Sequence, residues 1–209
     1  MDKTRFTLLF LTCIGITGFT FGQDKTRTIL DEVSSQLIAY SSLQADFSFS
    51  LVNEEADISD TFEGNLVMQG EKFRLSLMGI LAMCNGEKMW NYSEELNEAT
   101  ILDPDESEFF NPINIFTLYK QDFALKTISS QGAVHTIELL PNSENDEYTR
   151  IVLIVDHAKK LIREVTYFGS DGNKYIIKIT NVIPNIQVDD RFFMFDTSKY
   201  PDVSVYDMR

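Results

Sequence analysis

A strict alternation of apolar and polar residues between positions 43 and 77 is the feature that most restricts the fold. Its apolar positions are Leu43, Ala45, Phe47, Phe49 and Leu51, then Phe62, Gly64, Leu66 and Met68, then Phe73, Leu75 and Leu77. Because successive side chains of a strand point to opposite faces, this pattern predicts neighbouring strands that share one apolar face. Polar turns at 54–60 and 69–71 separate the strands, so this part of the chain is predicted to be an antiparallel meander.

An amphipathic helix is predicted before the meander, over residues 25–43. Ile29, Val33, Leu37 and Tyr40 recur at spacings of four, four and three, which places them on one helical face. This face needs an apolar partner, and the meander supplies one.

Further strands are expected after the meander. Residues 80–84 are apolar enough for a strand that is covered on both faces, and Asn85-Gly86 suits a tight hairpin. The alternation then puts Trp90 and Tyr92 on one face and Met89 on the other. Strands are also predicted at 133–140, 148–155, 161–168 and 174–183.

Residues 103–122 interrupt the strand rhythm and predict short helices or a lid. Pro104 and Pro112 break regular pairing there, and Phe116 is one of several apolar residues that could face the sheet. No linker, repeat or low-complexity segment divides the chain, so residues 23–209 are expected to form a single domain. Its class is mainly β with helices, built on one predominantly antiparallel sheet.

The first 22 residues have the pattern of a secretory signal peptide. Lys3 and Arg5 precede an apolar run over residues 6–21, and small residues at Thr20 and Gly22 suit cleavage before Gln23. Cys13 offers an alternative, since a cysteine near the end of such a segment could carry a lipid, but the apolar run continues past it. We therefore expect export followed by release into the periplasm.

Charge narrows the choice of partners. The chain has a formal net charge of −14, and removal of residues 1–22 leaves 16 basic and 31 acidic residues, a net charge of −15. Such a surface is repelled by nucleic acid and by anionic lipid head groups. We expect a soluble monomer that does not bind nucleic acid or anionic membranes by charge.

Catalytic and metal-binding patterns are absent from the sequence. His135 and His157 are the only histidines, and neither has a cysteine or second histidine at a metal-ligand spacing. Cys84 is the one cysteine after the signal peptide, so it forms no intramolecular disulfide and is expected to be buried. The acidic residues at 103, 105, 106 and 108 do not follow the calcium-loop spacing. We predict no catalytic residue, no metal and no cofactor.

The apolar faces suggest a binding function instead. With 16 phenylalanines and seven methionines, the sheet could enclose an apolar cavity that helices cover incompletely. The adaptable side chains of Met68, Met78, Met83 and Met89 would suit such a cavity. An ordinary filled core fits the same pattern, so both interpretations stay open. The predicted lipid-binding residues are Phe47, Phe49, Leu66, Met68, Phe73, Leu75 and Leu77, with Trp90, Tyr92 and Phe116 at a rim or lid contact.

Four segments together resemble the LolA-like outer-membrane lipoprotein carrier proteins. "LAMCNGEKMWNYSEELNEATI" is similar to the family's strand, Asn-Gly turn and Trp hairpin, and "LQADFSFSL" to its first strand. "FEGNLVMQGEKFRLSL" resembles its glycine-led hairpin, and "RFFMFDTSKYPDVSVYDMR" its closing Phe-x-Phe, Pro and Asp-x-Arg pattern. The four occur in the family's order and cover most of residues 25–209.

This resemblance implies a fold and a task. The fold would be a strongly curved, incomplete β-barrel closed by the N-terminal helix and short lid helices. Its cavity would shelter lipoprotein acyl chains, received from an inner-membrane ABC transporter and delivered to the outer membrane, with an outer-membrane receptor as a further partner. One departure is that residues 68–72 lack the proline of many members' hairpin turn and the arginine associated there with fastening the lid.

Two alternatives remain beside the carrier. A lipid sensor of the same fold would usually carry another domain, for which 187 mature residues leave little room. A lipid hydrolase would need a nucleophile with a base, and neither histidine has a recognisable partner.

Overall fold

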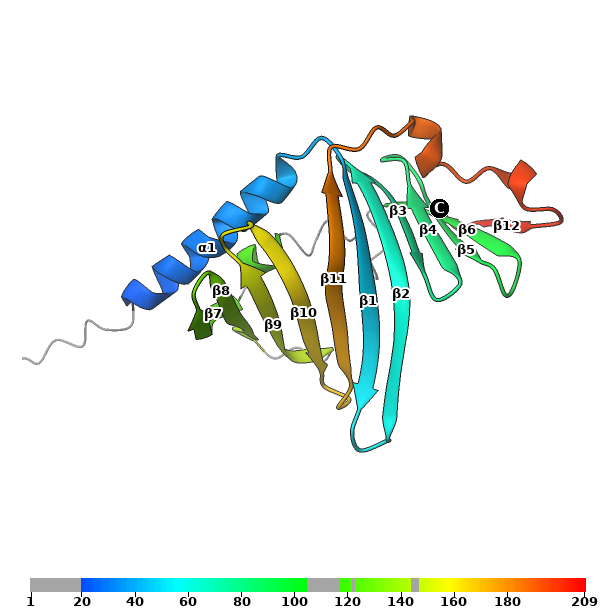
Figure 1. Cartoon of the computed structure of the whole chain (residues 1–209). Coiled ribbons are helices and arrows are strands. Elements are labelled where there is room, and N and C mark those ends of the chain that lie inside the picture. The colour runs from blue at the N-terminus through cyan, green and yellow to red at the C-terminus, as the bar shows by residue number, and fades with distance from the viewer. Residues whose placement is uncertain (1–19, 105–116, 122, 144–146) are drawn as a thin grey trace, which may run out of the picture.

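The computed structural model describes residues 20–104, 117–121, 123–143 and 147–209, with only the backbone described for residues 20–24 and 118. Within these residues twelve strands form one open, curved sheet (Figure 1). The strands are β1 (Leu43–Asn53), β2 (Ile58–Gln69), β3 (Lys72–Leu77), β4 (Ile80–Cys84), β5 (Met89–Ser93), β6 (Glu98–Leu102), β7 (Phe123–Gln131), β8 (Val134–Pro141), β9 (Tyr148–Asp156), β10 (Leu161–Gly169), β11 (Lys174–Pro184) and β12 (Ser204–Asp207).

The strand order is β12-β6-β5-β4-β3-β2-β1-β11-β10-β9-β8-β7. Neighbours are antiparallel except for β12, which pairs in parallel with β6. In the described part of the chain β7 and β12 are the two edges, and nothing pairs them with each other. The predicted class is therefore confirmed: a mainly β fold on a curved sheet that does not close into a barrel.

Strand β1 lies at the centre and joins the two halves of the sheet. It pairs with β2 from Leu43 to Asn53 and with β11 from Leu43 to Val52. Its first residues alternate between buried and half-buried side chains, as the period-two pattern predicts. The first meander and the C-terminal strands thus form one continuous surface.

Helix α1 (Thr20–Ile38) packs across one half of this surface, on β7 and β10 (Figure 1). Three of the predicted stripe residues, Ile29, Val33 and Leu37, are buried, and so is Leu30 beside them. Tyr40 lies beyond the last helical residue and is half-buried. Full burial of an aliphatic side chain contributes about 1.5–3 kcal/mol, so this face is enough to hold the helix on the sheet.

Strand β7 was not predicted from the sequence. Only Phe123 and Leu125 are buried in it, and its second half is largely exposed, so the alternation is too short to recognise. Of the segment predicted as short lid helices, the described residues include the 3₁₀-helix η1 (Leu118–Lys120). The prediction for residues 105–116, Phe116 included, lies outside the described residues.

In the ranges that the structure describes, no helix is both long enough and apolar enough to cross a membrane.

Candidate functional site

The inner face of the sheet, defined here as the face on which α1 packs, carries one continuous apolar cluster. The predicted residues Phe47, Leu66, Met68, Phe73 and Leu75 are buried members of this cluster, and Phe49 and Leu77 are half-buried and pack against it. The strand register explains why they meet: Leu43 is paired with Met68, and Met68 with Phe73. All seven residues therefore line one face, while their role in lipid binding remains a prediction.

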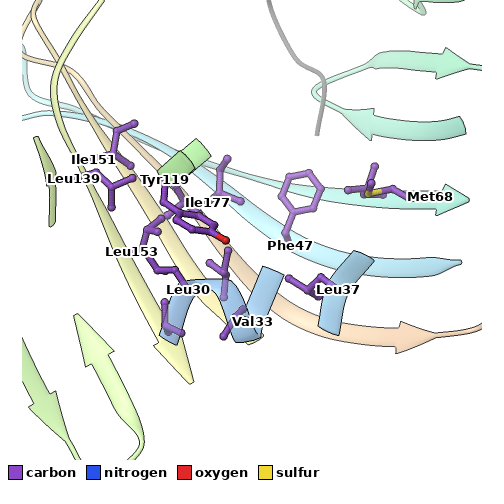
Figure 2. Packing of buried hydrophobic residues seen from close by; sticks show 14 of the residues in the cluster. Leu30, Val33, Leu37, Phe47, Met68, Tyr119, Leu139, Ile151, Leu153 and Ile177 are labelled. Carbon is purple, nitrogen blue, oxygen red and sulfur yellow. The ribbon is translucent and has the colours of Figure 1, made fainter. Parts of the chain in front are cut away.

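The two halves of the inner face are covered differently. On β8 and β9, beneath α1, Ile137, Leu139, Ile151 and Val155 have no exposed surface. Figure 2 shows Leu30 and Val33 of α1 directed at this half. Phe47 on β1 and Met68 on β2 lie farther along the sheet, past Leu37 at the end of the helix. The half beneath α1 is an ordinary filled core, and the predicted lipid-binding residues lie on the other half.

The cluster consists of aliphatic, aromatic and sulfur-containing side chains. Its polar atoms are few and neutral. Burial is the main cause that raises the pKa of Tyr119 to about 12, and the 2.7 Å hydrogen bond that its hydroxyl donates to Asp31 is the second. Burial and the neighbouring Tyr148 raise the pKa of Tyr167 to about 12 as well. Both phenols therefore stay protonated at neutral pH, and the face remains compatible with hydrocarbon.

Trp90 and Tyr92 lie on the outer face of the sheet, and their part in a rim or lid contact stays a prediction. They do share a face, as predicted, but Met89 beside them belongs to the inner cluster, so the two aromatics point away from it. Trp90 and Tyr92 are each 8% exposed. Their burial shows that another segment covers the outer face of this hairpin.

The covering segment comes from the C-terminus, residues 189–209. The rings of Phe195 and Tyr200 pack on Tyr92 with centroid distances of 5.4 and 4.5 Å. Arg74 donates to the carbonyl oxygen of Phe192 at 3.3 Å and lies over its ring, and Phe193 is completely buried.

Local hydrogen bonds shape the same segment into two short turns. Two 3₁₀-helices, η2 (Asp190–Phe193) and η3 (Thr197–Lys199), lie in this segment. The N-cap side chains of Asp189 and Asp196 accept hydrogen bonds from the backbone N–H groups of Arg191 and Ser198. Strand β12 then continues along β6. The C-terminal aromatic pattern noted in the sequence thus packs against the Trp hairpin, about a hundred residues earlier in the chain.

The histidines have structural partners. Nε2 of His157 lies 3.0 Å from a carboxylate oxygen of Glu32 on α1, and Nδ1 of His135 lies 2.9 Å from Oγ of Ser130. Burial, then the nearby His157 and Lys25, lowers the pKa of His135. In the described ranges, no group of three or more His, Cys, Asp or Glu side chains is placed to hold a metal ion. His157 thus connects α1 to the end of β9, and His135 connects β8 to β7.

Several contributors to the inner face were not identified from the sequence. Tyr119 lies in the segment predicted as a lid. Tyr148 and Tyr167, in predicted strands, form an edge-to-face pair at 6.2 Å. Alternation in residues 161–168 could have placed Tyr167 on the same face as Val165, because two positions separate them.

The sequence matches a family model over residues 39–196, the family being described as outer membrane lipoprotein carrier protein LolA. The chain belongs to the LolA family. The matched range contains the inner-face residues, the Trp hairpin and Phe195 of its outer cover. The resemblance seen in the four sequence segments is therefore confirmed.

Individual relatives agree with the family. An outer-membrane lipoprotein carrier protein from Coxiella burnetii (strain RSA 331 / Henzerling II) is 23% identical over 211 aligned positions, which cover 96% of this chain and 97% of the relative. The counterpart from strain RSA 493 / Nine Mile phase I gives the same values.

The fold is also similar to those of solved structures. An uncharacterized conserved protein from Thermus thermophilus has a TM-score of 0.59 at 12% identity, covering 88% of this chain and 99% of that one. A LolA superfamily protein from Nitrosomonas europaea has a TM-score of 0.44 at 9% identity, with coverages of 81% and 97%. The LolA family is one of carriers rather than enzymes.

Proposed function

We propose that the protein is a periplasmic carrier that shields the acyl chains of lipoproteins on its inner face and moves them from the inner to the outer membrane. The observation that carries this proposal is the extent of the apolar inner face. Uncharged side chains continue from the core beneath α1 across β1 to β4, where Phe47, Leu66, Met68 and Leu75 lie. Membership of a family of lipoprotein carriers supports the same function.

The energetics of acyl chains explain why a carrier needs such a face. Each buried methylene is worth about 0.8 kcal/mol, so an acylated protein free in water would aggregate or insert into the nearest membrane. The carrier must also release its cargo, and the flexible thioether side chains of Met68 and Met89 allow the face to adapt to more than one occupant.

The partners follow from this route. Acylated lipoproteins are the cargo, an inner-membrane ABC transporter supplies them, and an outer-membrane receptor is the candidate acceptor. The signal-peptide pattern of residues 1–22 supports export to the periplasm, where these two membranes face each other. No catalytic step is required, because transfer exchanges one apolar environment for another.

Native mass spectrometry of the protein isolated from the periplasm tests the proposal. Wild-type protein should be recovered with the added mass of an acylated protein. Leu75→Asp, which places a charge on the inner face, should lose this added mass, because an unpaired charge excludes hydrocarbon. Ser76→Asp is the matched control, since Ser76 follows directly on β3 and is exposed.

Folding has to be measured in parallel by circular dichroism and thermal melting. Leu75 is buried, so Leu77→Asp at a half-buried position serves as the milder variant. The proposal predicts folded variants without cargo. A folded Leu75→Asp or Leu77→Asp variant that retains acylated protein at the wild-type level would contradict it.

A further inference from the structure

Strands β10 and β11 separate toward one end of the sheet. They pair only from Glu164, opposite Lys178, to Phe168, opposite Lys174. Beyond this stretch residues 161–162 pair with β9 alone, and the rest of β11 pairs with β1 alone. In Figure 1 the two strands diverge at the end nearer to α1.

Two bulges account for the separation. The pairing of β10 with β9 shifts between Ile162 and Glu164, which leaves Arg163 as an extra residue. The pairing of β11 with β1 shifts between Ile179 and Asn181, which leaves Thr180 as another. A bulge bends its strand and increases the local twist. With one bulge in each strand at the same level, the two strands turn apart.

A groove of about 610 Å³ occupies the resulting gap. Its apolar lining includes Ile162, Ile179 and Val182. Ile162 is also a member of the inner-face cluster, and Ile179 and Val182 pack against that cluster. The groove and the inner face are therefore in contact with the same side chains.

The groove also exposes a strand edge. Among the residues that the structure describes, 179–184 of β11 pair with β1 alone, and the N–H and C=O groups of alternate residues point away from β1. A free edge of this length is a template for an added extended chain.

The charged side chains around the groove are mostly basic. Lys159, Arg163 and Lys178 line it beside one acidic residue, Glu164. Arg163 pairs with the buried Asp156, and Lys178 lies 3.4 Å from Glu164 with 60% of its side chain exposed. Lys159 forms no salt bridge with any described residue. Lys159 therefore contributes the positive charge of the lining that no described carboxylate pairs with, and this charge favours an acidic ligand.

We propose that this groove binds the polypeptide of a cargo protein, as an extended segment of alternating apolar and acidic residues added to the free edge of β11. The inference rests on the proposed function, because the cargo's acyl chains would occupy the inner face while its polypeptide must leave that face. In this groove the apolar side chains of the cargo segment pack against Ile179 and Val182. Its acidic side chains face Lys159 and Lys178.

Hydrogen exchange with a short synthetic peptide of alternating glutamate and valine tests the groove directly. The peptide should slow amide exchange at those residues of 179–183 whose N–H groups point away from β1, because it accepts hydrogen bonds from these groups. The Lys159→Glu/Lys178→Glu variant should bind the peptide at least tenfold more weakly. Lys126→Glu/Lys199→Glu, which changes two exposed lysines elsewhere by the same charge, should bind it as the wild type does. Exchange that slows elsewhere, or equal binding by both variants, would overturn the inference.

Three further ligands test this inference and separate it from the proposed function. A peptide with lysine in place of glutamate should bind wild-type protein at least tenfold more weakly, which needs no variant. Palmitate should bind regardless of the peptide. If palmitate binds and the acidic peptide does not, the groove inference fails alone, whereas failure of palmitate to bind contradicts the carrier. Protection of 179–183 by lysophosphatidylglycerol and not by the peptide would make the groove a lipid site and overturn the inference.

Discussion

The phenyl ring of Phe47 lies directly over Gly64 on the neighbouring strand. The two residues are cross-strand partners of β1 and β2, and a Cβ added at Gly64 would lie 2.3 Å from the terminal ring carbon of Phe47. Phe47 itself is 5% exposed and belongs to the inner-face cluster. The absence of a side chain at Gly64 is therefore what lets the ring lie flat against the sheet.

Gly64→Ala should lower the free energy of unfolding by about 1–3 kcal/mol, the usual cost of overpacking a well-filled site. Denaturation followed by circular dichroism measures this change. Phe47→Leu/Gly64→Ala should recover part of the loss, because a smaller side chain leaves room for the new methyl group. If the two substitutions simply add, the ring and the glycine are not coupled.

The C-terminal cover gives a second prediction. Phe193 is completely buried on the outer face, whereas Phe192 beside it is 39% exposed. Phe193→Ala should therefore destabilise the protein by about 3–5 kcal/mol, and Phe192→Ala by much less. Trp90 is the only tryptophan, so its emission should shift to longer wavelength when the cover loosens. Similar melting temperatures for the two variants would show that the cover does not depend on Phe193.

Cys84 provides a reporter of the inner face. It is 3% exposed, and burial raises the pKa of its thiol, so less of the reactive thiolate is present at neutral pH. Maleimide labelling of the folded protein should be much slower than labelling of a free cysteine, and palmitate should slow it further. Labelling at the rate of an unfolded control would show that this part of the inner face is open to water.

The buried His135 should make stability depend on pH. Burial lowers its pKa below the ordinary value of 6.5, so the unfolded chain binds a proton more readily than the folded protein. The stabilisation is fully present above pH 6.5 and is lost as the pH falls through the lower, folded pKa. His135→Asn should weaken this acid-side loss when the free energy of unfolding is measured between neutral and mildly acidic pH. An unchanged pH profile in the variant would assign the loss to other groups.

Much of the fold followed from period-two alternation. The pattern through Phe47, Leu66 and Leu75 identified both the strands and their shared face, because pairing of neighbouring strands keeps alternate side chains together. It could not show how that face is covered. The same alternation placed Trp90 and Tyr92 together but not on the outer face, since their covering partners lie near the C-terminus, far away in sequence.

Other features depend on contacts that no local pattern carries. Strand β7 has too few apolar residues after Leu125 to show alternation. The alternation identifies Gly64 only as a strand position, and the reason for a glycine there is visible only with the ring of Phe47 above it. The gap between β10 and β11 arises from extra residues at Arg163 and Thr180, which are defined only by the register of neighbouring strands.

Release of an acylated lipoprotein from inner-membrane vesicles tests the central claim most directly. The vesicles should contain the lipoprotein and its transporter, and the purified carrier is added with ATP. The account predicts that acylated protein leaves the vesicles in a soluble complex with the wild-type carrier and with Ser76→Asp, but not with folded Leu75→Asp. Acylated protein that stays in the vesicles with the wild-type carrier, or that is released equally by Leu75→Asp, would contradict it.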